Sequence, residues 1–190
     1  MPREKILCGK EEIFRVAIDI VEQAGMADLS MRAIAKALGV SPMTIYNYVE
    51  NLQAIKKRVL ITAFDRLYEL VYSELNKLTM PVDKTVFCKT VAMSVYKFSA
   101  ENKNMFAFMF SDGCAMFSND AEVKPFYDFI SKLTQRAKST QKSYATNEQG
   151  YKLLEILIFS VTYQFATGVR SLTEKEYSEY IDYYLKKCIS

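Results

Sequence analysis

The sequence has 190 residues, half of them hydrophobic, which is enough for a small head on a larger body with its own interior. A formal net charge of +3 neither favours nor excludes a nucleic-acid partner, because acidic residues elsewhere can mask a local basic surface. The chain has no histidine, phosphate-binding glycine loop or nucleophile motif. We therefore expect a cytoplasmic protein that is not an enzyme, with no metal, no cofactor and no membrane-spanning segment.

The four cysteines, Cys8, Cys88, Cys114 and Cys188, lie far apart in the sequence and have no spacing typical of a metal site. We expect reduced and mostly buried thiols. A redox sensor that uses Cys88 and Cys114 is the alternative.

The first predicted helix spans residues 10–24. Its apolar residues, which include Ile13, Ala17 and Val21, recur at helical spacing, and Gly25 follows the last of them. Packed on the next two helices, this helix would complete a three-helix head.

Residues 30–48 predict two short helices joined by a tight turn. Ser30 and Ser41 are good helix caps, and Gly39 stands where the chain needs a positive φ angle. Ala35 is small enough for the second helix to cross closely, and Pro42 suits a first helical position. This spacing indicates a helix-turn-helix whose second helix enters the major groove of DNA. An ordinary helical hairpin explains the apolar positions equally well, but not the short or hydrogen-bonding residues that face outward.

The rest of the chain also predicts helices, and we find no strand alternation or repeat. A long helix to about residue 78 connects head and body. Further helices are predicted over residues 82–100, 102–110, 122–142, 144–170 and 173–188, with a loop over 111–120. The expected fold is all-α with about nine helices, divided into a DNA-binding domain (1–50) and a ligand-binding and dimerisation domain (51–190).

The head resembles the TetR family of bacterial repressors. Leu29 to Ala35, Leu38 to Ser41 and Ile45 to Val49 carry this resemblance, which covers about residues 10–60. It implies a homodimer that binds a palindromic operator in double-stranded DNA, most simply a repressor released by a small-molecule effector in the body. A helical carrier of an apolar small molecule and a DNA-binding activator without inducer remain as alternatives.

The resemblance places Ser30, Ser41 and Tyr46 on phosphate contacts and directs the other outward residues of the second helix at base edges. Leu52 stands where the family usually has a lysine, so we expect weaker, more salt-sensitive anchoring, partly replaced by a later lysine. Val49 replaces the usual phenylalanine. The expected DNA contacts are Ser30, Arg32, Ser41, Pro42, Met43, Thr44, Tyr46, Asn47, Tyr48, Lys56 and Lys57.

Eight of the twelve phenylalanines lie between Phe87 and Phe129, which predicts either a well-filled core or a ligand cavity. Glu155 interrupts the most apolar helix, where it would pair with a basic side chain, lie at an interface rim or balance the charge of a cationic ligand. The candidate pocket residues are Phe64, Phe87, Met93, Tyr96, Phe106, Met109, Phe110, Phe129, Glu155 and Phe159.

The helix over residues 144–170 is apolar almost all round, and the last helix is rich in tyrosine. Such helices must be covered on both sides, which favours a subunit interface over a plain intramolecular hairpin. The candidate interface residues are Leu154, Ile158, Val161, Phe165, Tyr177, Ile181 and Tyr184.

Overall fold

The computed structural model describes residues 9–79, 82–128 and 148–188, and these residues form helices and no strand. The predicted all-α class is therefore confirmed. The helices are α1 (Lys10–Ala24), the 3₁₀ turn η1 (Met26–Asp28), α2 (Met31–Leu38), α3 (Pro42–Tyr46), α4 (Leu52–Leu75), α5 (Lys84–Glu101), α6 (Lys103–Met109), α7 (Asp112–Ala115), α8 (Lys124–Tyr127), α10 (Glu148–Ala166) and α11 (Glu174–Cys188).

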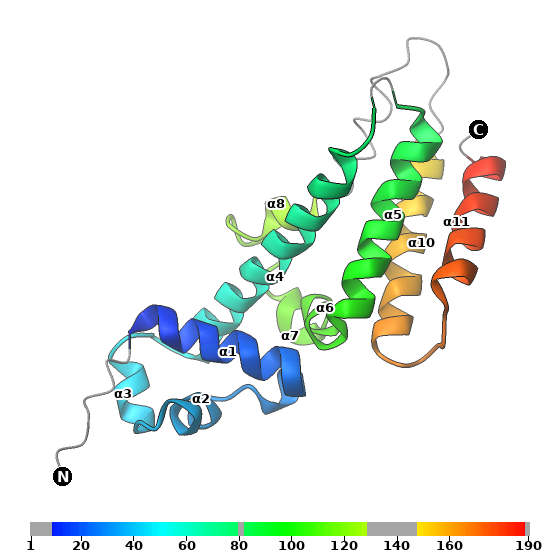
Figure 1. Ribbon diagram of the computed structural model, residues 1–190. Helices are drawn as coiled ribbons and strands as arrows, with labels where there is room; N and C mark the ends of the chain where they lie inside the picture. The colour runs from blue at the N-terminus through cyan, green and yellow to red at the C-terminus, as the bar shows by residue number, and fades with distance from the viewer. Residues whose placement is uncertain (1–8, 80–81, 129–147, 189–190) are drawn as a thin grey trace.

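Helices α1, α2 and α3 form a head at one end of an elongated molecule (Figure 1). Helix α1 has the predicted bounds, and Ile13, Ala17 and Val21 are fully buried on its inner face. Gly25 ends the helix with φ +85°, a conformation that residues with a Cβ atom rarely adopt. Its N–H donates to the carbonyl of Val21, so the turn that leads into α2 is closed by a backbone hydrogen bond.

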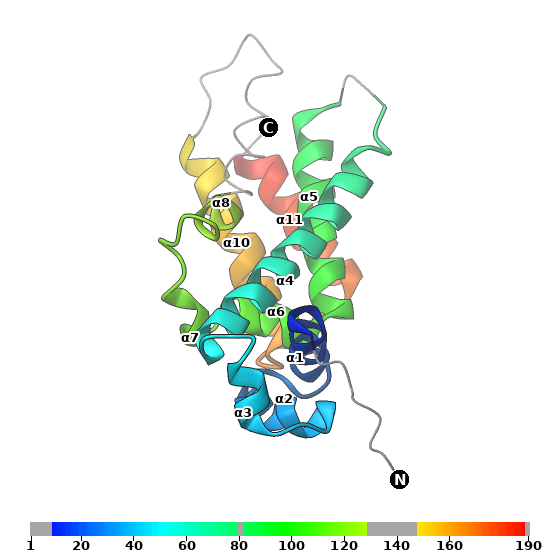
Figure 2. The same ribbon diagram turned by 90° about the vertical axis from the view of Figure 1, so that its left-hand side faces the viewer.

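Helix α4 is the spine of the molecule and runs from the head along the length of the body (Figures 1 and 2). The side chain of Asn51 caps its start by accepting the N–H of Ala54 at 2.9 Å. The helix ends at Leu75, three residues before the predicted end, because the next residues close short turns in which the N–H of Leu78 donates to the Leu75 carbonyl. Buried residues along α4 join the cores of the head and the body.

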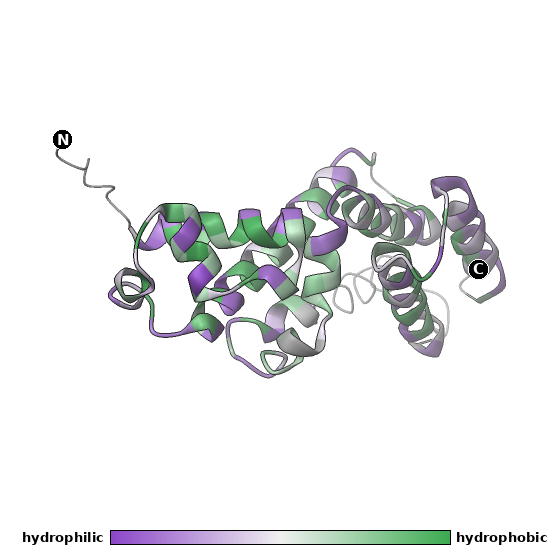
Figure 3. Ribbon diagram, turned by 90° about the horizontal axis from the view of Figure 1, so that it is seen from below, coloured by the Kyte–Doolittle hydropathy of each residue, from purple (hydrophilic) through white to green (hydrophobic). Residues whose placement is uncertain are grey.

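Helix α5 is the centre of the body and packs against α4, α10 and α11. Helix α6 lies between the head and the body, since it contacts α1 as well as α4, α5 and α10. The molecule seen from below shows hydrophilic residues over most of α11 (Figure 3), and Tyr177, Ile181 and Leu185 are its buried residues. In the part of the chain that the structure describes, no helix is long and apolar enough to cross a membrane.

Two predicted segments differ in detail from the structure. The expected loop over residues 111–120 contains one helical turn, α7, where the N–H groups of Cys114 and Ala115 donate to the carbonyl of Ser111. The predicted helix over 122–142 is described only as far as Asp128 and begins with the four-residue helix α8; its remainder lies outside the described residues.

Candidate nucleic-acid interface

The turn between α2 and α3 has the predicted chemistry. The hydroxyl of Ser30 accepts the N–H of Ala33 at 3.1 Å, and the hydroxyl of Ser41 accepts the N–H of Thr44 at 3.2 Å. Gly39 has φ +66°, in the left-handed region, and lets the N–H of Val40 donate to the Ala35 carbonyl at 3.0 Å. Both helices are therefore capped, and the turn between them is fixed by its backbone.

Buried side chains set the angle between the two helices. Ile34 and Ile45 are fully buried, and only 1% of Ala35 is exposed, so α3 lies close against α2. Val49 is 5% exposed and fills its place in the core despite its smaller size. Among the residues that the structure describes, no element covers the opposite side of α3.

The outward side of α3 carries most of the predicted DNA contacts. Met43 is 73% exposed and Tyr46 51%, and Pro42, Asn47 and Tyr48 are exposed beside them. Helix-turn-helix proteins place a surface of this kind in the major groove.

Thr44 differs from its exposed neighbours. Its side chain is half-buried, and its hydroxyl lies 3.0 Å from the hydroxyl of Ser41, so that it extends the cap of α3. The Thr44 hydroxyl, which the sequence analysis assigned to a base edge, is therefore already hydrogen-bonded to Ser41.

The cations predicted to contact DNA differ in how exposed they are and in whether they form an ion pair. Arg32 is exposed on α2, and Lys36, which the sequence analysis did not select, is exposed one turn later. Lys56 is half-buried in α4. The ammonium of Lys57 instead lies 2.9 Å from Asp120 and 2.5 Å from Glu122.

The assignment of Lys57 to DNA therefore stays a prediction that this pairing disfavours. Its partners follow α7 and are more than sixty positions away along the chain, so no local pattern indicates the contact. The two carboxylates raise the pKa of Lys57, so this cation stays charged and turned toward the body.

The head is also tied to the body at the end of α1. Glu22 pairs with Arg66 of α4, and its backbone carbonyl accepts the side-chain amide of Asn104 at 2.9 Å. The hydroxyl of Ser111 donates to the sulfur of Met26 at 3.2 Å. The orientation of the head is therefore coupled to α4, α6 and the segment before α7.

Four of the predicted pocket residues form an aromatic cluster between α4, α6 and α10. The rings of Phe106 and Phe159 each lie 5.0 Å from Phe110, and the ring of Phe64 lies 6.2 Å from it. The sequence analysis missed Phe126, which stacks on Phe64 at 5.5 Å.

Tyr68 completes this aromatic cluster and was also missed. Its ring lies 5.2 Å from that of Phe126, and its hydroxyl donates to the Phe126 carbonyl at 2.8 Å. The sequence could have indicated Tyr68, because it lies one helical turn after Phe64 and therefore on the same helix face. We define the aromatic cluster by its six residues: Phe64, Tyr68, Phe106, Phe110, Phe126 and Phe159.

The other predicted pocket residues do not gather at one place. Tyr96 stacks between Phe165 and Tyr177, with ring centroids 5.1 and 4.9 Å away. Met93 lines an open hollow with Glu74 and Lys97. Phe87 lies in the first turn of α5, at the end away from α6, Met109 is fully buried, and Phe129 lies outside the described residues.

Glu155 is half-buried on α10, one turn before Phe159 of the aromatic cluster. Burial raises the pKa of its carboxyl group, and the nearby charge of Asp128 raises it further. No ion pair joins Glu155 to a basic side chain among residues 9–79, 82–128 and 148–188. Within these ranges, Glu155 adds a negative charge beside an aromatic surface.

The predicted interface residues lie mainly inside the protomer. Leu154, Ile158, Tyr177 and Ile181 have no exposed surface and pack in the core around α5. Val161, Phe165 and Tyr184 are half-buried, and the hydroxyl of Tyr184 donates to the Gly150 carbonyl at 2.6 Å. The four fully buried side chains therefore hold α10 and α11 within one subunit and have no surface to offer a second one, whereas the assignment of Val161, Phe165 and Tyr184 to an interface stays a prediction.

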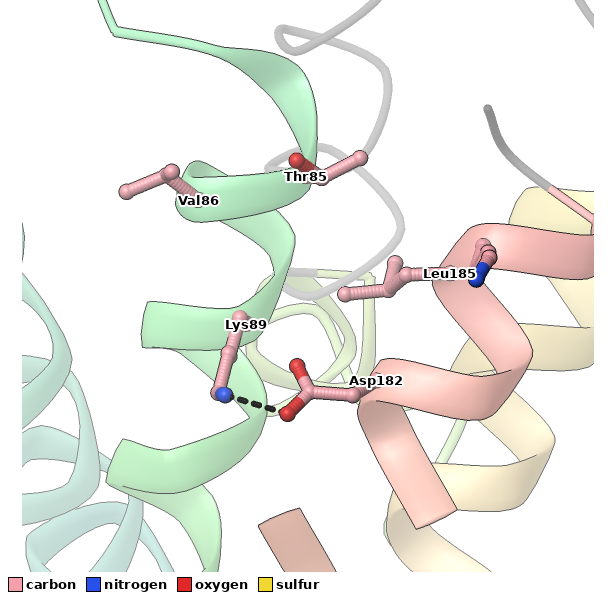
Figure 4. Close-up of a pocket in the computed structure, with 6 residues that line it drawn as sticks. Thr85, Val86, Lys89, Asp182 and Leu185 are labelled. Carbon is pink, nitrogen blue, oxygen red and sulfur yellow. Dashed lines mark hydrogen bonds and ion pairs between the residues drawn. The ribbon is translucent and has the colours of Figure 1, made fainter. Parts of the chain in front are cut away.

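Other residues of the same two helices present an apolar surface. Leu153 is 53% exposed and Ile156 59% on α10, and Tyr180 is 51% and Tyr183 69% exposed on α11. We call these four residues the outer patch. On another side of α11, Asp182 accepts from the ammonium of Lys89 at 2.6 Å and ties the helix to α5 (Figure 4).

Two of the three described thiols, those of Cys88 and Cys114, are buried as expected, and that of Cys188 is half-buried. Burial raises the pKa of Cys88 to about 12 and that of Cys114 to about 11. Thiols that remain protonated at neutral pH react slowly with oxidants, which argues against the redox-sensor alternative. Cys8 lies outside the described residues.

Comparisons with known proteins agree with this geometry. Residues 13–51 match the family of bacterial regulatory proteins, tetR family. A stretch of 57 residues is 30% identical to YobS of Bacillus subtilis (strain 168), an uncharacterized HTH-type transcriptional regulator, and spans 30% of each chain. The matched residues thus run from α1 to the residue before α4 and contain the helix-turn-helix.

The similarity of fold extends over the whole chain. A TetR-like transcriptional regulator from Rhodococcus sp. RHA1 is 14% identical, with a TM-score of 0.68 over 100% of this chain and 98% of that chain. FadR of Thermus thermophilus, a TetR family transcriptional repressor in complex with lauroyl-CoA, is 19% identical, with a TM-score of 0.61 over 95% of this chain and 93% of that chain. The body thus has the fold of TetR-like regulators.

Proposed function

We propose that this chain is a DNA-binding transcriptional regulator that binds a palindromic operator as a homodimer. The observation that carries the proposal is α3 itself, which is capped at its start, fixed by Ile45 and open to solvent on its outer side. Hydroxyl groups around α3 would hold phosphates, and its outermost side chains would contact base edges. The protein would act in the cytoplasm, where its DNA partner lies.

We further propose that regulation is repression released by a small molecule. We place the site for an aromatic or apolar ligand at the aromatic cluster, where Phe106 is fully buried, Phe110, Phe126 and Phe159 are half-buried and Glu155 lies one turn before Phe159. A ligand there contacts α4, α6 and α10, the first two of which also contact α1 of the head. It would act through its preference for the head arrangement that does not fit the operator. This function needs no catalytic group, in keeping with the expectation that the chain is not an enzyme.

The second subunit would cover the outer patch. Leu153 and Ile156 are exposed three positions apart on α10, and Tyr180 and Tyr183 are exposed three positions apart on α11, so each pair shares one side of its helix. Four large apolar side chains that are at least half exposed on the two helices packed on α5 favour a protein interface.

The first test is selection of bound sequences from random duplex DNA at physiological salt. We expect a palindrome with half-sites about one helical turn, ~34 Å, apart. Tyr46→Ala should weaken binding to the selected duplex. The matched variant Tyr46→Phe loses only the phosphate-directed hydroxyl, so its affinity should lie between those of Tyr46→Ala and the wild type. Binding that is independent of sequence, or no binding, would overturn the proposal and favour the helical carrier.

A further inference from the structure

The geometry of α3 singles out two side chains as its outermost pair. Successive residues of a helix are about 100° apart, so positions two before and two after Ile45 both point nearly opposite to it. Ile45 is fully buried in the head, and the opposite positions are Met43 and Asn47. Asn47 keeps a helical backbone, with φ −71° and ψ −17°, and therefore continues this face.

Both side chains are available to a partner. Met43 is 73% exposed, the largest exposed fraction among the large hydrophobic side chains of the described residues. Asn47 is exposed, and its side-chain amide makes no hydrogen bond to the described residues. A flexible apolar group and a free amide thus lie side by side on the helix that the proposed function places in the major groove.

The composition of α3 narrows the bases that it can read. Guanine is most often recognised by arginine or lysine, and cytosine by a carboxylate, but α3 contains none of these residues. Thr44, its one internal hydroxyl besides that of Tyr46, extends the Ser41 cap. The remaining pairings are asparagine with the N6 and N7 atoms of adenine and an apolar side chain with the methyl group of thymine.

We infer that Met43 contacts a thymine methyl group and Asn47 an adenine edge, so that the base pairs facing α3 in each half-site are A·T pairs. This inference rests on the proposed DNA binding and specifies its sequence class. Two residues four apart on a helix are separated by ~6 Å, less than two base-pair steps of ~3.4 Å. Met43 and Asn47 would therefore read base pairs at most two steps apart.

The test uses the duplex selected by the full-length protein. Each thymine of the half-site is replaced in turn by deoxyuridine, which removes only the methyl group. We expect one position at which this replacement weakens wild-type binding about fourfold per half-site, the effect of one buried methyl group. Met43→Ala should bind more weakly and be insensitive to deoxyuridine at that position, whereas Met116→Ala, which replaces another exposed methionine, should behave as the wild type.

A second arm tests the adenine contact. Replacing one adenine by 7-deazaadenine, which lacks the N7 acceptor, should weaken wild-type binding but leave Asn47→Ala unaffected. The variants Met43→Ala and Asn47→Ala should each lose base preference at certain positions of the half-site. If all of these positions are G·C pairs in the selected sequence, the inference is overturned while the proposed function stays intact. Sequence-specific binding that is indifferent to every thymine methyl would also overturn it. Failure to select any sequence would instead contradict the proposed function.

Discussion

At the scale of single residues, the negative charge of Glu155 lowers the stability of the folded protein. Its carboxyl group is half-buried near Asp128, and both burial and this neighbour raise its pKa above the ordinary value of 4.5. In the unfolded chain the group has its ordinary pKa. Between the two values the folded protein binds more protons, so its stability falls as the pH rises through this window and stays lower above it.

Glu155→Gln should therefore raise the Tm at pH 7 by a few degrees or less. The gain should shrink as the pH falls from the raised pKa of the folded protein toward 4.5 and should be lost below 4.5, where the carboxyl group is protonated in both the folded and the unfolded chain. Thermal unfolding followed by circular dichroism at several pH values measures this. Glu179→Gln on the exposed side of α11 is the control and should change little. A lower Tm for Glu155→Gln at pH 7 would mean that its carboxylate has a favourable partner.

At the scale of elements, the head follows from the sequence because its signals are local. Caps at Ser30 and Ser41 and the positive φ of Gly39 depend on residues within one turn, and all three occur as predicted. Helix α10 is different. It is apolar almost all round, so no polar face fixes which side turns inward, and packing on α5 selects Leu154 and Ile158 rather than Leu153 and Ile156.

Contacts between elements that are far apart in the sequence cannot be predicted from a local pattern either. The aromatic cluster needed the three-dimensional arrangement of four helices, although Phe64, Phe106, Phe110 and Phe159 had been selected for their chemistry. The partners of Lys57 show the same limit. A lysine near the head resembles a phosphate contact in the sequence, but carboxylates after α7 hold it in the folded protein.

The cations of α2 and α4 are therefore expected to differ in their effect on DNA binding. Arg32→Gln should reduce the slope of log K against log salt by about 0.9 per head, because one phosphate contact is lost. Lys57→Gln should leave the slope unchanged, since its ammonium is bound to Asp120 and Glu122. Titrations of the selected operator at several salt concentrations distinguish these outcomes. Equal losses of slope for both variants would restore Lys57 to the DNA interface.

Lys57 should instead affect the segment between α7 and α8. The carboxylate of Asp120 also accepts the N–H of Glu122 at 2.9 Å, so the ion pair and the turn share one side chain. We expect faster amide hydrogen exchange at residues 120–124 in Lys57→Gln and unchanged exchange there in Arg32→Gln. This result would show that Lys57 joins α4 to the segment before α8, the helix that carries Phe126.

At the scale of the whole molecule, head and body are joined by more than the covalent link of α4. The Glu22–Arg66 ion pair and the contacts of α1 with α6 also join the head to the body, and the proposed regulation would use these contacts to transmit a shift of the body to the head. The proposed regulation also needs two such subunits held at a fixed separation, because a shift of a few ångströms moves one head away from its half-site. The surface that joins the subunits is thus as important to the function as α3.

The outer patch provides a direct test of that assembly. The double variant Ile156→Glu and Tyr183→Glu places two carboxylates on the apolar surface, where a second subunit would bury them without partners. We expect a folded monomer by size-exclusion chromatography with light scattering, and operator affinity reduced to that of a single head. Val169→Glu is the matched control, because Val169 is 72% exposed in the turn between α10 and α11 and lies outside the patch. A variant that keeps the mass of a dimer would show that another surface joins the subunits, and a wild-type protein with the mass of a monomer would contradict the proposed homodimer itself.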